Sequence, residues 1–276
     1  MSDPLVTADW LARNLDQVIV LDATYYLPPD PAQSRLDFET TRIPGARLFE
    51  VDEIADQASD LPHMLPDEAR FAAAMAELGI DGTKPVVVYD RSATHFSAPR
   101  VWYTLRLFGL NECYVLDGGL PLWIKGGHPV EAGACQNAAV AARDWTLARH
   151  MVLSGAELAE RVAAGGETVI DARSQERFDG TAPEPRPGLS SGHMVGASCL
   201  PFPALTGEDG RFADVATLKE LFAAVDGGAP IVTCGSGMTA CVLALGLARL
   251  GLGARLYDGS WAEWGQDTLG AIQTSR

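Results

Sequence analysis

The sequence predicts an α/β protein made of two tandem domains, each with a parallel sheet flanked by helices on both of its faces. Short apolar stretches alternate with amphipathic ones along the chain, which is the pattern of βαβ units. The order of these stretches in the first half recurs in the second half. With 276 residues, the chain is long enough to form two domains of ordinary size.

The repeat is clearest where the buried strands end. A β-branched run ends at Asp22 in the first half, and a run of the same pattern ends at Asp171 in the second. In each half the next apolar strand follows at nearly the same spacing and leads into Asp90 or Cys234. Because several features match in the same order, we interpret the two halves as copies of one fold.

A stretch rich in alanine and polar residues, without a strong period, separates the two halves. We therefore expect a first domain at residues 1–135, a linker at residues 136–150 and a second domain at residues 151–276. Each domain would then carry its own hydrophobic core.

The charge balance is strongly acidic. Lys and Arg number 21 against 36 for Asp and Glu, which gives a formal net charge of -15. Such a surface repels nucleic acid, because binding to phosphates needs clustered cations. The N-terminus carries no pattern of a secretory signal, and no stretch approaches the roughly 18 apolar residues that span a bilayer. We expect a cytoplasmic protein with small-molecule ligands, bound to neither nucleic acid nor membrane.

The five cysteines are irregularly spaced, and none belongs to a Cys-x-x-Cys pair. This spacing disfavours a zinc site or a thioredoxin-type motif, so we expect no metal. Most cysteines in a protein of this kind are small buried hydrophobic residues. We therefore expect at most one or two of them to be reactive.

Cys234 stands where a buried strand is expected to give way to a helix. The loop from 234 to 240 reads Cys-Gly-Ser-Gly-Met-Thr-Ala and follows an apolar strand that ends at residue 233. Ligands of open parallel sheets bind at the carboxyl ends of the strands. Two glycines let the backbone amides turn inward, where they and the helix dipole would stabilise a thiolate, a persulfide or an oxyanion. The pattern alone also fits a buried structural cysteine ahead of a turn.

Together with other segments, this loop gives the chain a resemblance to the tandem rhodanese-type sulfurtransferases. The similarity is greatest to the branch that takes sulfur from 3-mercaptopyruvate, and it extends over nearly the whole chain. Departures from the family pattern include Arg42, where histidine is usual, Met238, where valine is commoner, and Ala182, where glutamate is common. The segments that carry the resemblance are residues 49–52, 61–66, 96–102, 117–119, 177–186, 234–240 and 258–261.

The resemblance implies that Cys234 is the nucleophile and carries the transferred sulfur as a persulfide. It also implies that Arg177 and Arg186 hold the carboxylate of a keto acid, for which the guanidinium fork is well suited. Ser236, His63 and Asp52 match a family relay that moves a proton near the nucleophile. The remaining loop residues would contact the substrate: Gly235, Gly237, Met238 and Thr239.

The first half has Asp90 at the position of Cys234 and therefore cannot supply a thiol nucleophile. We interpret this domain as a catalytically silent copy. The implied reaction is covalent and ping-pong: the persulfide forms on Cys234 as pyruvate leaves, and cyanide or a thiol such as reduced thioredoxin removes the outer sulfur. It requires no metal and no organic cofactor.

Three alternatives remain open. A thiosulfate:cyanide sulfurtransferase would use the same nucleophile, but it usually has basic residues after the cysteine, where this chain has Gly235 and Ser236. A cysteine phosphatase would need arginine at position 240, which is Ala240. A non-catalytic binding module is disfavoured because the second copy keeps both the cysteine and the arginines.

Overall fold

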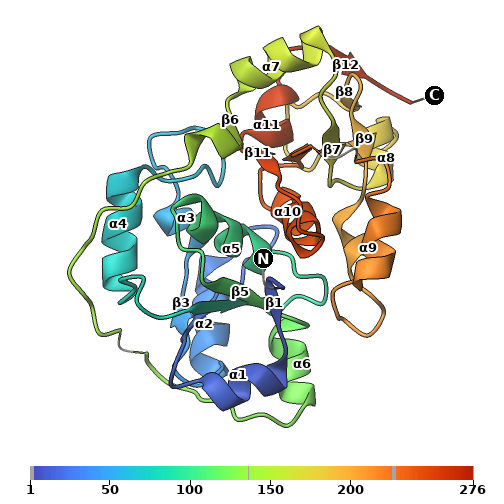
Figure 1. Cartoon of the computed structure of the whole chain (residues 1–276). Helices are drawn as coiled ribbons and strands as arrows, with labels where there is room; N and C mark the ends of the chain where they lie inside the picture. Colours follow the sequence, from blue (N-terminus) through green and yellow to red (C-terminus); the bar gives the residue numbers. More distant parts are fainter. Residues whose placement is uncertain (1–2, 136, 226–227, 276) are drawn as a thin grey trace. The chain divides into compact units, whose positions relative to one another are not determined.

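A computed structural model describes residues 3–135, 137–225 and 228–275, which fall into two compact units (Figure 1). The first unit takes in the described residues of Met1–Gln57, Leu65–Ala148 and Thr206–Phe212. The second takes in those of Ala58–Met64, Arg149–Leu205 and Ala213–Arg276. Each unit thus includes one short segment whose sequence neighbours belong to the other. Residue 136, where the linker was expected to begin, lies outside the described residues, and the expected domain boundaries stay a prediction.

The first unit is built on a five-stranded sheet with the order β1-β5-β4-β2-β3, and every neighbouring pair is parallel. Helices α1, α2 and α6 pack on one face, and their apolar side chains share one core with the strands (Figure 1). Its strands are β1 (Leu5–Val6), β2 (Ile19–Asp22), β3 (Arg47–Leu48), β4 (Val86–Tyr89) and β5 (Cys113–Leu116). Its helices are α1 (Ala8–Asn14), α2 (Pro31–Thr40), α3 (Val51–Ile54), α4 (Glu68–Glu77), α5 (Ala98–Leu107) and α6 (Gly119–Lys125).

The second unit repeats this plan. Its main sheet has the order β6-β11-β10-β7-β9, again parallel throughout, which is the first order with each strand replaced by its counterpart. A two-stranded antiparallel sheet joins β12 to β8. The strands are β6 (Val152–Leu153), β7 (Val169–Asp171), β8 (His193–Met194), β9 (Ser198–Cys199), β10 (Ile231–Thr233), β11 (Arg255–Tyr257) and β12 (Ile272–Gln273). The helices are α7 (Gly155–Ala164), α8 (Gln175–Asp179), α9 (Val215–Leu221), α10 (Ala240–Arg249) and α11 (Ser260–Trp264), with short 3₁₀ turns at Arg149–Met151 and Phe202–Leu205.

The predicted α/β fold of two similar parallel-sheet domains is confirmed. The strands β2, β4, β7 and β10 are buried along their whole length, as expected of parallel strands covered on both faces. In register, Asp22 pairs with Tyr89 and Asp171 pairs with Thr233. The residues that follow β4 and β10 therefore emerge at the carboxyl edge of each sheet, where ligands of such folds bind.

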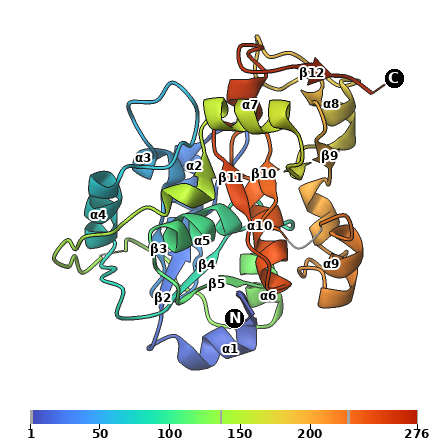
Figure 2. The same cartoon turned by 45° about the horizontal axis from the view of Figure 1, so that its top comes forward.

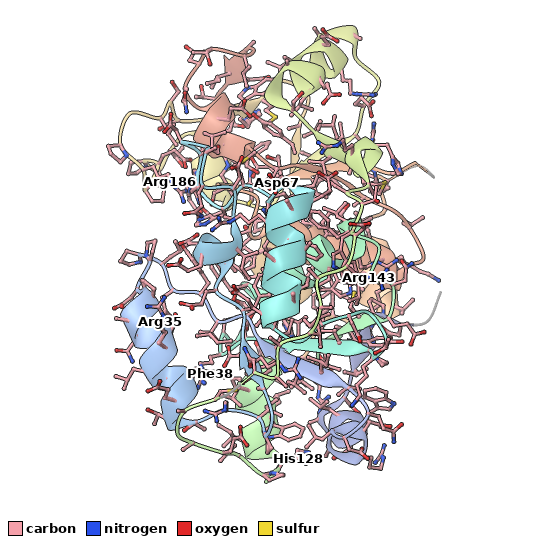
Figure 3. All side chains as sticks on the ribbon, turned by 90° about the vertical axis from the view of Figure 1, so that its left-hand side faces the viewer. Arg35, Phe38, Asp67, His128, Arg143 and Arg186 are labelled. Carbon is pink, nitrogen blue, oxygen red and sulfur yellow. The ribbon has the colours of Figure 1, made fainter. Side chains whose placement is uncertain are left out.

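Arg42 has a structural role in the first unit. Its side chain is buried, with Nε donating to Glu131 Oε1 at 2.8 Å and the guanidinium lying 4.8 Å from the centre of the Phe38 ring. Phe38 lies on α2, as Figure 3 shows. The arginine thus fastens α2 to the chain that follows α6. Among the described residues, no helix combines the length and the apolar character needed to cross a bilayer.

Candidate active site

Cys234 directly follows β10, and the loop that it begins ends at α10 (Figure 2). The residue is 1% exposed, and Ser236, Met238 and Thr239 of the same loop are also buried. Gly237 has a φ of 75°, the left-handed conformation that glycine adopts without a steric penalty. The loop is therefore a tight, closed turn at the carboxyl edge of the sheet.

The start of α11 anchors this loop from one side. The amide of Trp261 donates to the Cys234 carbonyl at 2.9 Å, and that of Ala262 donates to the Gly235 carbonyl at 2.9 Å. The Ser260 hydroxyl oxygen accepts from the amides of Cys234 and Gly237. Within the described part of the chain, four loop amides keep no hydrogen-bond partner: those of Gly235, Ser236, Met238 and Thr239. The loop therefore cannot use all of its amides to bind an anion, but these four remain able to donate hydrogen bonds.

The two predicted substrate arginines lie together against this loop. A Cβ atom placed on Gly235 would stand 3.2 Å from Arg177 Nη2 and 3.9 Å from Arg186 Nη1. A larger residue at this position would displace the Arg177 guanidinium slightly, whereas glycine leaves room for its close approach. Figure 3 labels Arg186, whose Nη2 donates to Ser236 Oγ at 3.3 Å. The structure therefore brings Arg177, Arg186, Ser236 and the residue next to Cys234 to one place.

Glu184, which the sequence analysis did not single out, holds Arg177. Its carboxylate accepts from Arg177 Nη2 at 2.5 Å and from Arg177 Nε at 3.2 Å, and its side chain is 2% exposed. The same carboxylate accepts from Arg173 Nη1 at 2.7 Å. The sequence signal that could have identified Glu184 is its position between Arg177 and Arg186 in the same segment. A bidentate pair of this kind fixes the plane of the guanidinium.

Arg173 is the buried centre of this network. It pairs with Asp171 at 2.7 Å and lies 3.9 Å from the centre of the Trp261 ring. Burial lowers the pKa of Arg173, but the Asp171 and Glu184 carboxylates outweigh it and leave the pKa raised. Arg173 is therefore a permanent charge that holds Glu184, while Arg177 and Arg186 remain next to the loop.

The local charges leave one cation in excess. Asp171 and Glu184 together offset two positive charges among Arg173, Arg177 and Arg186. Of the residues that the structure describes, none places a carboxylate in an ion pair with Arg186, whose hydrogen-bond partner is Ser236. A ligand carboxylate would thus meet a cation, Arg186, that no described carboxylate pairs with, despite the net charge of -15 of the chain.

His63 and Asp52, the other predicted relay residues, belong to different compact units. His63 lies in the segment Ala58–Met64 of the second unit, is buried, and has a φ of 61°. Positive φ is uncommon for a residue other than glycine and indicates that its surroundings constrain it. Asp52 lies on α3 of the first unit, where its Oδ2 accepts from the Tyr25 hydroxyl at 3.0 Å. The relay stays a prediction, and the membership of His63 in the unit of Cys234 could not be foreseen from its sequence position.

The matching loop of the first unit is occupied by its own anion. The Asp90 carboxylate is buried and accepts from the amides of Ser92 at 2.9 Å, Ser97 at 2.8 Å and Ala98 at 2.8 Å. These are the donors that an anionic ligand would otherwise use. The Asp90 side chain thus takes up the hydrogen bonds that would otherwise be available to a bound anion.

Two other cysteines are poor nucleophiles. Burial raises the pKa of Cys113 to about 12, and burial together with the Asp171 charge raises the pKa of Cys199 to about 12. Both stay protonated at neutral pH, and the thiolate is the reactive form. In the described part of the chain, no three His, Cys, Asp or Glu side chains are grouped in a way that could hold a metal ion.

Comparisons with known proteins find similarity over nearly the whole chain. The profile of the family described as the rhodanese-like domain matches residues 7–125 and 154–267. The mitochondrial thiosulfate/3-mercaptopyruvate sulfurtransferase 1 of Arabidopsis thaliana is 40% identical over 289 residues, covering 95% of this chain and 76% of the relative. The human 3-mercaptopyruvate sulfurtransferase is 37% identical over 271 residues, covering 94% of this chain and 91% of the relative.

A solved structure agrees over the same length. The crystal structure of SseA from Escherichia coli, described under 3-mercaptopyruvate sulfotransferases, superposes with a TM-score of 0.83 and 34% sequence identity. The superposition covers 95% of this chain and 100% of that one. The likeness therefore includes both units and is not confined to the loop of Cys234.

Proposed function

The chain belongs to the family of proteins built from rhodanese-like domains and is a sulfurtransferase, and from this we propose that it takes sulfur from 3-mercaptopyruvate through a persulfide on Cys234. The observation that carries the proposal is the position of two guanidinium groups, Arg177 and Arg186, over the residue that follows Cys234. A keto acid held by its carboxylate at these groups would present its thiol to the cysteine.

The first half-reaction follows from this placement. The Cys234 thiolate attacks the sulfur of 3-mercaptopyruvate and the carbon–sulfur bond breaks. The electron pair moves onto the neighbouring carbonyl to form an enolate, which takes up a proton and leaves as pyruvate. The outer sulfur stays on Cys234. The four unpaired loop amides support this step, because they can donate to the persulfide anion.

The second half-reaction removes the outer sulfur. We propose cyanide or a thiol, including reduced thioredoxin, as the acceptor. Ser236, His63 and Asp52 would move the proton that the thiol donor or acceptor loses. The hydrogen bond between Arg186 and Ser236 supports part of this proposal, because it links the substrate arginine to the first member of the relay.

Thiosulfate is the second candidate donor, because the Arabidopsis relative carries both donors in its name. The single excess cation of the site favours a monoanionic keto acid over a dianion. A comparison of kcat/KM for the two donors decides between them. A strong preference for thiosulfate would overturn our choice of donor.

Mass spectrometry of the intact protein tests the persulfide. After incubation with 3-mercaptopyruvate we expect one added sulfur atom, located on Cys234 by peptide mapping. C241S is the matched control, since Cys241 is a buried thiol in the first turn of α10, and it should gain sulfur as the unchanged protein does. If C234S still transfers sulfur to cyanide, Cys234 is not the carrier, and a binding module or a different nucleophile must be considered.

A further inference from the structure

Ser260 has a backbone conformation that serine rarely adopts. Its φ is 50°, in the left-handed region, and its side chain is fully buried at the start of α11. Residues other than glycine are strained there, and such strain persists only where the surroundings impose it. Burial of a hydroxyl also requires partners for its polar atoms. Both features need an explanation.

The hydroxyl of Ser260 connects the two ends of the Cys234 turn. Its oxygen accepts from the amide of Cys234 at 3.2 Å and from the amide of Gly237 at 3.0 Å. Its own proton goes to the Tyr257 carbonyl at 2.9 Å, so the oxygen faces the loop as an acceptor. Thr233 Oγ1 lies 3.2 Å away and adds a further contact below the loop.

The first unit supplies an internal comparison. The turn Asp-Gly-Ser at 258–260 corresponds to Asp-Gly-Gly at 117–119, so Gly119 is the counterpart of Ser260. Gly119 has a φ of 53°, and a Cβ on it would stand 2.4 Å from the Asp90 carbonyl oxygen. The two residues therefore share a left-handed φ, although the glycine before each differs, with a φ of 77° at Gly118 and -59° at Gly259. The silent unit has glycine, whereas the unit with the cysteine has serine in a strained conformation.

The difference between Gly119 and Ser260 can be explained by the hydrogen-bond acceptor that each loop has of its own. In the first unit, the Asp90 carboxylate holds the loop amides from within the loop. A cysteine at that position cannot do so, because a thiol is a weak acceptor. An oxygen from outside the loop must replace the carboxylate, and it must leave other amides free. Ser260 meets both conditions, since it takes two amides and leaves those of Gly235, Ser236, Met238 and Thr239 unpaired within the described residues.

We propose that Ser260 is a positioning residue for the nucleophile: its hydroxyl holds both ends of the Cys234 turn, so that the unpaired amides stay available to the sulfur atom. The proposal rests on the proposed function of Cys234 as the sulfur carrier. It also explains the strained backbone, because only a residue with a side chain can bring an oxygen to this place.

The test compares S260A with S260G. Both lack the hydroxyl, but S260G also removes the strain, because glycine adopts positive φ freely. We expect S260G to be more heat-stable than S260A. We expect both to react with iodoacetamide at Cys234 at least about tenfold more slowly at pH 7, with the midpoint of the rate–pH profile at least about half a pH unit higher than in the unchanged protein. The modified peptide is quantified by mass spectrometry.

S198A is the control, because Ser198 also bonds a backbone carbonyl, that of Val169, but lies on β9 away from the loop. It should keep the original profile. If reactivity follows stability, so that S260G reacts like the unchanged protein while S260A does not, the role of Ser260 is structural and the proposal fails. It also fails if both variants react normally. Should S260A not fold, S260G alone decides, since its backbone suits the turn.

This readout separates the inference from the proposed function. Alkylation reports on the surroundings of Cys234 and needs no sulfur donor. If C234S retains sulfur transfer, the proposed function fails whatever the Ser260 variants do. If the protein forms a Cys234 persulfide but the Ser260 variants keep the original alkylation profile, only the positioning role is lost.

Discussion

At the scale of single residues, the site is distinguished by how it limits its own positive charge. Arg177 and Arg186 lie against the Cys234 loop, and Arg173 is linked to Arg177 through Glu184. Asp171 and Glu184 offset two of these three charges. Arg177 is thereby oriented rather than left free, and Arg186 supplies the excess charge. In the proposed reaction, the buried carboxylate of Glu184 would act on the substrate through Arg177.

The variant E184Q tests this balance. It keeps the shape of the side chain but removes a negative charge, which leaves a second cation uncompensated and loosens Arg177. We expect kcat/KM for 3-mercaptopyruvate to fall roughly tenfold, and the ratio of kcat/KM for thiosulfate to that for 3-mercaptopyruvate to rise. E160Q on α7, where the exposed Glu160 has no part in the network, is the control. An unchanged donor ratio in E184Q would show that Glu184 does not set the charge of the site.

At the scale of elements, the loops after β4 and β10 meet the same structural requirement with different hydrogen-bond acceptors. Each leads from a buried strand into a helix whose first amides need acceptors. In the first unit Asp90 accepts from Ser97 and Ala98 at the start of α5, where the Ser97 side chain makes no capping bond of its own. A carboxylate in this place is favoured by the helix dipole as well.

We therefore expect D90N to destabilise the protein. The amide keeps the size of the side chain but can no longer offer two charged oxygens to three amides. The free energy of unfolding should fall by about 1–2 kcal/mol, as for the loss of a helix cap with charged hydrogen bonds. Urea denaturation followed by circular dichroism measures it. D16N, at an exposed aspartate, should change little, and an equal loss in both variants would refute a specific role for Asp90.

The sequence was sufficient to predict these elements but not the contacts that complete them. The repeat, the buried strands and the position of Cys234 depend on local patterns of apolar residues, which can be read directly. The hydroxyl of Ser260 and the carboxylate of Glu184 depend on side chains that meet only after folding. Glycine and serine at 119 and 260 look interchangeable in a turn, and only their φ angles of 53° and 50° show that one of them is strained.

At the scale of the whole molecule, the halves of the sequence are interleaved, because each compact unit includes a segment from the other half. The segment Thr206–Phe212 belongs to the first unit, where the Phe212 amide donates to Asp117 Oδ1 at 2.8 Å. The ring of His95 packs edge-on against Phe212 at 5.5 Å, and its Nδ1 lies 3.4 Å from Thr206 Oγ1. Segment membership of this kind has no local sequence signal, which is why the unit that contains His63 was not predicted either.

The attachment of this segment should depend on pH through His95. Burial lowers the pKa of His95 below its usual value of about 6.5, and the neutral ring is also required for Nε2 to accept from the Gly118 amide at 2.9 Å. In the unfolded chain His95 would take up a proton as the pH falls below about 6.5, whereas in the folded chain it would do so only at lower pH. The unfolded state then binds more protons, so stability is lost as the pH falls through this range.

The substitution H95N isolates this contribution, because asparagine tolerates the φ of 53° found at this position but does not titrate. We expect the free energy of unfolding, measured in urea at pH 7 and at pH 5, to fall more with acidification in the unchanged protein than in H95N. The difference in slope cannot exceed about 1.4 kcal/mol per pH unit, the limit for a single proton. The other histidines are common to both proteins and cancel in the comparison. Equal slopes would mean that His95 binds the same number of protons in the folded and unfolded states over this range, so that folding does not lower its pKa.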